Sequence, residues 1–372
     1  MANTLDYLDW RGDLDFSVSA FNEVDMFICS QLSTPDYSGI VPEDGESVPI
    51  GEVVEKYFET HEDNVGSLGV LQSSYVLPML KKLPLTKRYE NLRLKYAVNH
   101  VVQDNEEQFC AVTIELPDGT TCVSFRGTDD TIIGWKEDFN LATSSSVPAQ
   151  IDARLYLKGV LEKCPGAFRV CGHSKGGNLA VYAGVTAPLW DKSRILEIYN
   201  FDGPGFSPVF FTKKGYSDIK DKITTVLSQH SLVGTLLEPA GNIVYLVSCT
   251  AGPMAHDGFN WQVLGSSFER SEGLSDTSRA FDSAMGDTLS GMSVKERQGF
   301  IDELFNTLLS TGAVTITDLT KMSPVSFLEL LKGFRNDRKV QSFTKCLTEL
   351  FMKSMSDPIA SSINKLADKI KI

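Results

Sequence analysis

The chain lacks a cysteine pattern that would indicate a metal site or a disulfide framework. Its 372 residues include seven cysteines, but no two of them form a Cys-x-x-Cys pair, and their number is odd. Most lie in apolar stretches typical of strands or helices, where a thiol behaves as a small hydrophobic group. We therefore expect neither a metal ion nor an organic cofactor in the protein.

The chain also has no excess of positive charge. Its net charge is −13 and its pI is near 4.9. Nucleic acids and anionic membranes bind cationic patches, so neither is an expected partner. No apolar run approaches the length of a membrane span, and residues 1–10 contain no basic region followed by an apolar core. We expect a cytoplasmic protein without an integral membrane segment.

What the chain does contain is the composition of a globular protein, with 42% hydrophobic and 22% charged residues. Residues 1–90 predict an N-terminal region of helices and loops, including an amphipathic helix within 21–32. Residues 91–265 alternate strands with helices. Residues 266–372 are expected to be all-helical, with a capping box at 293–296 before a helix that stops at Gly312, and further helices within 324–332 and 338–355.

The middle region predicts a mainly parallel sheet covered by helices. Strands are expected at 96–102, 109–116, 120–126, 168–171, 195–200, 223–227 and 243–248, and helices at 135–141 and 153–163. Pro117-Asp118-Gly119 predicts a hairpin turn between the second strand and the third. Because strands and helices then alternate, the fold class is α/β.

A Gly-x-Ser-x-Gly pattern, Gly172-His173-Ser174-Lys175-Gly176, lies between the strand at 168–171 and a helix rich in small residues. In this context the pattern indicates a nucleophile elbow, a tight turn that lifts the serine hydroxyl above the sheet. The first helical N–H groups then point toward the bond that the serine attacks. We therefore expect Ser174 to be the nucleophile of a serine hydrolase.

A serine needs a base to take its proton, and the chain offers five histidines. His61 and His100 precede the nucleophile, whereas the base follows it in the Ser, acid, His order of this architecture. The side chain of His173 would diverge from the neighbouring serine, which suits a packing and orienting residue. His256 follows the last predicted strand, where the base is expected, and His230 remains the second candidate.

The acid that orients the imidazole is expected at Asp202, which ends the strand at 195–200 in a turn of glycine and proline. Catalytic groups collect at this edge of an open α/β sheet. The segment after the next strand, residues 228–231, contains no acid. Asp257 is a less favourable alternative acid because it adjoins His256 in the sequence. The other interpretation of Asp202 is an aspartate that only stabilises its own turn.

Donors for an oxyanion hole are expected from two places. The backbone N–H of Lys175 is one, because it begins the helix after the elbow. Thr128 is the other, because it follows the strand end at Phe125-Arg126-Gly127 and can present both its N–H and its hydroxyl.

These motifs carry a family resemblance. Phe125-Arg126-Gly127-Thr128, followed by Trp135, Asp138 and the elbow, resembles the class 3 lipases of the α/β-hydrolase superfamily over about residues 96–261. This implies an α/β-hydrolase fold in which Thr128 lines the oxyanion hole. The fuller pattern is similar to the Mbeg-like family, a lipase-related bacterial domain of unknown function, through the blocks 6–13, 21–25, 231–234 and 256–261. That resemblance implies only a hydrolase.

The chain departs from the lipase pattern at two positions. The acid that class 3 lipases place after the penultimate strand is replaced around Ser231, so the role passes to Asp202. Lys175 stands where lipases carry an apolar residue, and its ammonium either attracts anionic substrates or pairs with a neighbouring carboxylate.

Ser174, His256 and Asp202 thus predict a lipase-type or esterase-type hydrolase of small acyl ester or lipid substrates. Two alternatives remain open. One is an amidase, peptidase or thioesterase on the same fold, and the other is a non-catalytic binding protein that keeps the elbow. The serine-rich stretch 141–153 lies where a lid would cover the site, although its composition is that of a flexible loop.

Overall fold

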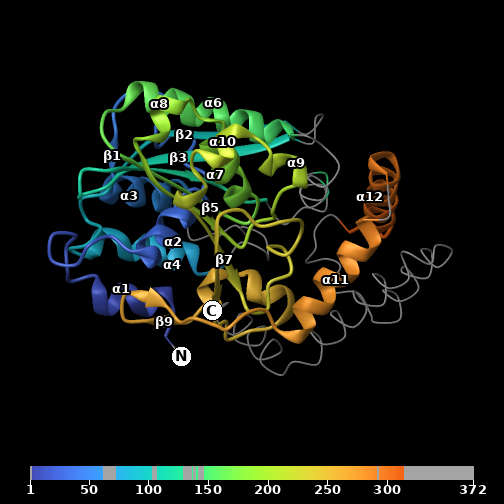
Figure 1. Ribbon diagram of the computed structural model, residues 1–372. Helices are drawn as coiled ribbons and strands as arrows, with labels where there is room; N and C mark the ends of the chain where they lie inside the picture. The colour runs from blue at the N-terminus through green and yellow to red at the C-terminus, as the bar shows by residue number, and fades with distance from the viewer. Residues whose placement is uncertain are drawn as a thin grey trace.

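Eight strands form one sheet in the order in which they occur along the chain (Figure 1). The computed structural model describes residues 2–61, 73–102, 107–128, 136, 140, 146–290 and 293–313. The first four strands pair antiparallel, namely β1 (Val48–Pro49), β2 (Arg93–Val102), β3 (Glu107–Glu115) and β4 (Thr121–Phe125). The next four continue from β4 in parallel, namely β5 (Phe168–His173), β6 (Ile195–Phe201), β7 (Ile223–Ser228) and β8 (Asn242–Leu246). The predicted α/β class is confirmed.

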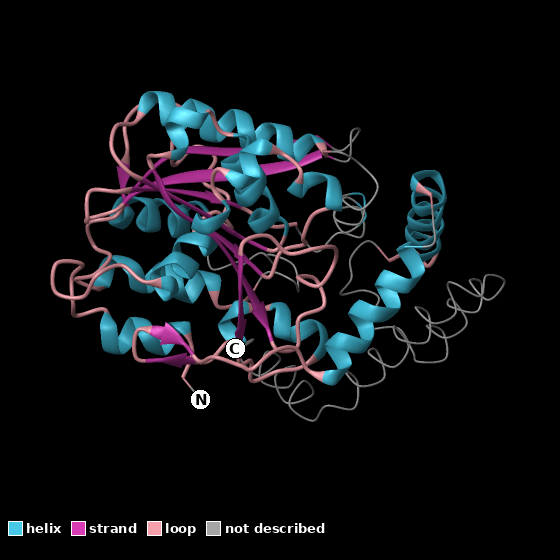
Figure 2. Cartoon of the chain, viewed as in Figure 1, coloured by secondary structure: helices cyan, strands magenta, loops and turns pink. Residues whose placement is uncertain are grey.

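Helices cover both faces of this sheet (Figure 2). On one face lie α1 (Thr4–Arg11), α2 (Glu23–Gln31), α3 (Ile50–Thr60) and α4 (Val76–Lys82), and on the other lie α6 (Pro148–Lys163) and α7 (Lys175–Thr186). The alternation of side chains along a strand separates the two cores. Cys122 of β4 and Cys171 of β5 join the first core, whereas their neighbours Val123 and Val170 join the second.

The N-terminal helices are anchored by a buried charge network. Asp25 of α2 and Arg88, which follows α4, form a two-pronged ion pair, and both side chains are fully buried. The hydroxyl groups of Tyr7 and Tyr89 also donate to Asp25. Arg88 further donates to the backbone oxygens of Leu14, Ser19 and Ala20 at 2.8 to 3.1 Å. A single residue pair therefore holds together three separate segments of the N-terminal region.

Local signals account for several element boundaries. Gly119 has φ +82°, and Asp118 accepts from the Thr120 N–H at 2.9 Å, which builds the predicted hairpin turn. The predicted helix at 153–163 instead begins at Pro148, because Pro fits a first helical turn and the Gln150 side chain accepts from the Val147 N–H. The end of the stretch predicted as a flexible loop is therefore helical.

The C-terminal region contains elements that the sequence predicted and one that it did not. The capping box at Ser293 and Glu296 begins α12 (Val294–Leu309), as predicted. The sequence singled out no helix at α11 (Asp276–Ser290), although it lies within the region expected to be helical, and the last strand pair, β9 (Val263–Leu264) with β10 (Ser267–Phe268), ends just past residue 266. The helices predicted within 324–332 and 338–355, and most of the one at 135–141, lie outside the described residues. In the part of the chain that is described, no helix combines the length and apolar character needed to cross a membrane.

Candidate active site

Ser174 lies on a strained turn between β5 and α7. Its backbone angles are φ 58° and ψ −135°, a region that residues with a side chain rarely occupy. A Cβ added at Gly172 would lie 2.2 Å from the Gly176 carbonyl oxygen, and one added at Gly176 would lie 2.0 Å from that of Phe125. Only glycine fits at either position, so the spacing of the motif follows from the close packing of this turn against β4 and β5.

Asp202 and His256 are hydrogen-bonded to each other. Asp202 follows the end of β6 with φ 52°, and His256 ends the short 3-10 helix η4 (Gly252–His256). The Nδ1 of His256 lies 2.7 Å from Oδ2 of Asp202, and the two residues are 6% and 0% exposed. Because an ionised carboxylate can only accept, Nδ1 carries the proton and Nε2 presents a lone pair.

Ser231 completes the surroundings of this carboxylate. Its hydroxyl donates to Oδ1 of Asp202 and accepts from the Gly234 N–H at 3.1 Å. Burial raises the pKa of Asp202, and the hydrogen bonds from His256 and Ser231 oppose that rise. The segment at 228–231 after β7, which contains no acid, therefore supplies a donor to Asp202.

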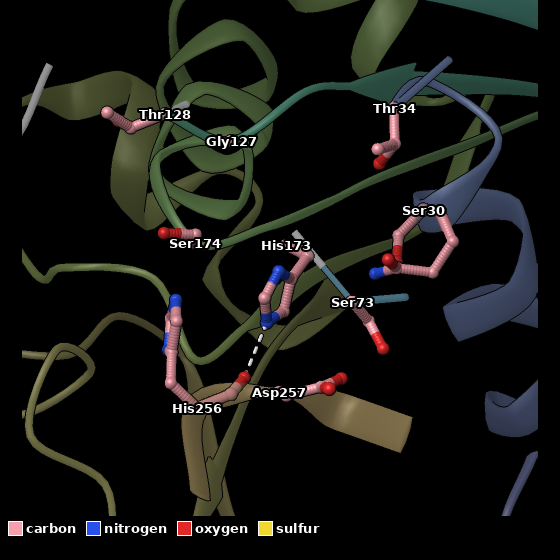
Figure 3. Close-up of a pocket in the computed structure, with 10 residues that line it drawn as sticks. Ser30, Thr34, Ser73, Gly127, Thr128, His173, Ser174, His256 and Asp257 are labelled. Atoms are coloured by element: carbon pink, nitrogen blue, oxygen red, sulfur yellow. Dashed lines mark hydrogen bonds between the residues drawn. The ribbon is translucent and has the colours of Figure 1, made fainter. Parts of the chain in front are cut away.

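Ser174 and His256 line one pocket together with Gly127 and Thr128 (Figure 3). In the close-up, the imidazole of His256 points toward the Ser174 hydroxyl, and Thr128 lies beyond Ser174 at the end of β4. A Cβ at Gly127 would lie 2.9 Å from that of Ser174, so the end of β4 packs directly against the elbow. Three of the five predicted site residues, Ser174, His256 and Thr128, thus line one pocket. Asp202 is hydrogen-bonded to His256 behind them, and the backbone of Lys175 begins α7 next to Ser174.

The model of one protein family matches residues 83–306, and the family is described as Mbeg1-like. The chain belongs to the Mbeg1-like family. Among solved structures it is similar to an M37 lipase, with 16% identity over 57% of this chain and 68% of that one and a TM-score of 0.36. It is also similar to a Rhizomucor miehei lipase in complex with its propeptide, with 17% identity over 42% of this chain and 57% of that one and a TM-score of 0.30. No curated protein matches it.

In this Mbeg1-like protein, an aromatic cluster supports the segment that carries His256. Trp261 donates from Nε1 to the Ala255 carbonyl oxygen at 2.9 Å, which fixes the backbone next to His256. The ring of Phe27, from α2, lies 5.3 Å from that of Trp261 and 6.2 Å from that of His173. Helix α2 is therefore part of the structure that positions the site.

His173 holds the backbone of His256 through a hydrogen bond of 2.8 Å from its Nε2 to the His256 carbonyl oxygen. A carbonyl can only accept, so this nitrogen carries a proton. Burial, with a smaller contribution from the neighbouring His256, lowers the pKa of His173 to about 3. His173 is therefore a neutral donor at physiological pH, which agrees with the orienting role expected from the sequence.

The half-buried imidazole of His173 makes the stability of the protein depend on pH. Below pH 6.5 the unfolded chain takes up a proton that the folded protein takes up only near pH 3, so folded stability falls across that window. The variant His173→Gln keeps a donor but does not titrate, and we expect it to lose about 2 kcal/mol less than the wild type between pH 7 and pH 5. Urea unfolding at both pH values measures this, and equal losses in the two proteins would contradict it.

The other sequence candidates lie apart from Asp202. His230 contacts the side chain of Gln229 at 3.1 Å, His61 contacts the Tyr57 carbonyl oxygen at 2.9 Å, and His100 lies 4.0 Å from Glu43. The side chain of Lys175 is 1% exposed, so its ammonium does not face solvent and the idea that it attracts anionic substrates has no support. Trp135 and Asp138 lie outside the described residues. The remaining candidate acid, Asp257, lines the pocket.

Several residues that build the site carried no signal in the sequence. Asn178 of α7 donates to the backbone oxygens of Pro204 and Gly205, and Asn200 exchanges two hydrogen bonds with the backbone of Gly203. These contacts fix the turn that carries Asp202. The far half of the pocket is lined by Ser30, Gln31, Thr34 and Ser73 from the N-terminal region. Among the described residues, no group of three or more potential ligands could hold a metal ion.

Proposed function

We propose that the protein is a serine hydrolase of the lipase or esterase type, which cleaves carboxylic esters with Ser174, His256 and Asp202. The observation that carries the proposal is the buried 2.7 Å hydrogen bond between His256 Nδ1 and Asp202 Oδ2, next to a serine on a strained elbow. An imidazole held in this way has the tautomer that a general base needs. We further propose an α/β-hydrolase core at 91–265, with a helical region on either side at 1–90 and 266–372.

In the first half of the reaction, the hydroxyl oxygen of Ser174 attacks the acyl carbon while its proton passes to Nε2 of His256. Asp202 stabilises the positive charge that develops on the imidazole. The carbonyl oxygen becomes an oxyanion, and the Lys175 N–H together with Thr128 supplies the donors that stabilise it. As the ester bond breaks, the alcohol takes the proton from Nε2 and leaves an acyl group on Ser174.

In the second half, water attacks the acyl group and gives its proton to Nε2. The same oxyanion donors act again, and the carboxylic acid leaves as Ser174 recovers its proton. Besides the substrate and this water molecule, each step uses only side chains and backbone groups of this chain. The fixed placement of Asp202, through Ser231 and the turn at 203–205, keeps the imidazole in one orientation through both halves.

A fluorophosphonate probe tests this function directly, because it reacts with an activated serine. We expect the wild type to be labelled at Ser174, Ser174→Ala to show no labelling, and His256→Ala to lose at least about 10³-fold in rate. His230→Ala is the matched control, since it removes a histidine that lies apart from Asp202, and it should react like the wild type. No labelling of the wild type at neutral pH would falsify the proposal.

A substrate panel separates ester hydrolysis from the same chemistry on other bonds. We expect p-nitrophenyl esters to be turned over with a higher kcat/KM than acyl thioesters or peptide anilides. A marked preference for the anilide would favour an amidase, and labelling without turnover of any of these substrates would favour a binding protein.

A further inference from the structure

The half of the pocket beyond His173 is polar. Ser30 and Gln31 at the end of α2, Thr34 in the following turn, Ser73 and Asp257 line it, whereas Ser174, His256 and Thr128 lie on the other side of the His173 ring (Figure 3). An ester hydrolase that accepts long acyl chains needs an apolar channel at its serine. The side chains described here instead offer hydroxyl groups, an amide and a carboxylate to whatever enters.

Asp257 carries the only carboxylate among the described residues that line the pocket. Its Oδ1 accepts from the Phe259 N–H at 3.0 Å. Burial raises the pKa of Asp257, and the neighbouring Ser73 hydroxyl acts to lower it. No lysine or arginine of the described chain forms an ion pair with it. Asp257 is half-buried, and a partly desolvated carboxylate without a cationic partner would be stabilised by a positive group in the pocket.

The neighbouring polar groups offer several hydrogen-bond acceptors to this space. The hydroxyl of Ser30 donates to the Phe27 carbonyl oxygen at 2.6 Å, so it can only accept from Gln31. The amide nitrogen of Gln31 is thereby turned toward Ser30, which leaves its oxygen available. The Thr34 hydroxyl forms no hydrogen bond with the described residues, so its oxygen is also available to accept one. A group with several N–H donors is the complement of this set.

We propose that Asp257, with Gln31, Thr34 and Ser73, forms a subsite for a primary ammonium group of the substrate. The inference rests on the proposed function, because the subsite shares its pocket with Ser174. It narrows the substrate class to esters that carry a positively charged amine close to the scissile bond. An ammonium has three N–H donors and a compact charge, which match one carboxylate and nearby neutral acceptors.

Protection of Ser174 from the fluorophosphonate probe tests the subsite without assuming whether the acyl or the alcohol group occupies it. The labelling rate is measured with increasing n-butylammonium chloride, and with 1-butanol plus sodium chloride at the same ionic strength. We expect n-butylammonium to protect the wild type at a concentration at least about tenfold lower than 1-butanol does, because a charge-assisted hydrogen bond forms only with the cation.

The variant Asp257→Asn keeps the acceptor for the Phe259 N–H but removes the charge, and it should abolish the difference between the two protectants. Asp221→Asn, at an exposed acid outside the pocket, is the matched control and should keep the difference. Equal protection by both compounds in the wild type, or an unchanged difference in Asp257→Asn, overturns the subsite alone. A wild type that is not labelled at Ser174 overturns the proposed function and the subsite with it.

Discussion

The variant Asp202→Asn is expected to lower kcat for ester hydrolysis by about 10⁴-fold while the protein stays folded. The side chain of Asp202 accepts the proton of His256 Nδ1 at 2.7 Å. An amide at the same place can instead donate to Nδ1, which moves the imidazole proton to Nε2. A protonated Nε2 cannot accept from Ser174, so the serine is no longer activated. Steady-state kinetics with a p-nitrophenyl ester measure the loss.

Thermal unfolding separates this effect from a loss of structure. Burial raises the pKa of Asp202, which means that the folded protein disfavours its charge. The amide carries no charge and its oxygen still accepts from Ser231, so we expect the unfolding midpoint to stay close to that of the wild type. If D202N keeps its kcat within tenfold of the wild type, the acid lies elsewhere, and Asp257 is the next residue to replace.

The core of the site was predictable because its signals are local. Each strand end is marked by the step from an apolar run to glycine, proline or a polar group, and parallel strands bring those ends to one edge. Ser174, Asp202 and His256 could therefore be assigned from their places after strands. The glycines at 172 and 176 report the tight packing of a single turn, which is also encoded within a few residues.

The rest depends on contacts between distant segments, which a sequence pattern does not contain. Ser30 reaches the pocket because α2 packs against β5 and the segment that carries His256, and Ser73 reaches it from the segment before α4, and no spacing in the chain indicates either. The missed helix α11 has another cause. Its apolar residues Phe281, Met285 and Leu289 do recur at helical spacing, but the serine, threonine, aspartate and glycine residues around them are weaker helix formers than alanine or leucine.

The variant Asp25→Ala is expected to lower the free energy of unfolding by about 3–5 kcal/mol. Removal of this carboxylate leaves the fully buried guanidinium of Arg88 without its ion-pair partner and takes an acceptor from Tyr7 and Tyr89. An uncompensated buried charge is among the most destabilising changes that one substitution can make. Urea unfolding at neutral pH measures the loss, and Asp9→Ala, which breaks the exposed pair with Lys82, should cost at most about 1 kcal/mol.

The double variant Asp25→Leu with Arg88→Met identifies the cause of that loss. If the cost of Asp25→Ala comes mainly from a stranded charge, apolar groups of similar volume at both positions should recover the part of the stability that this charge costs, although the hydroxyls of Tyr7 and Tyr89 still lack their acceptor. If the cost instead comes from weaker hydrogen bonds between the Arg88 guanidinium and the carbonyl oxygens of Leu14, Ser19 and Ala20, the double variant should be at least as unstable as Asp25→Ala. Ser30 and Gln31 of α2 line the pocket, so a change that displaces α2 should also lower activity. If the stranded charge is the cause, Asp25→Ala should be less active than the wild type, and the double variant should recover activity together with stability. Recovery of stability without activity would show that this network also sets the position of the pocket wall.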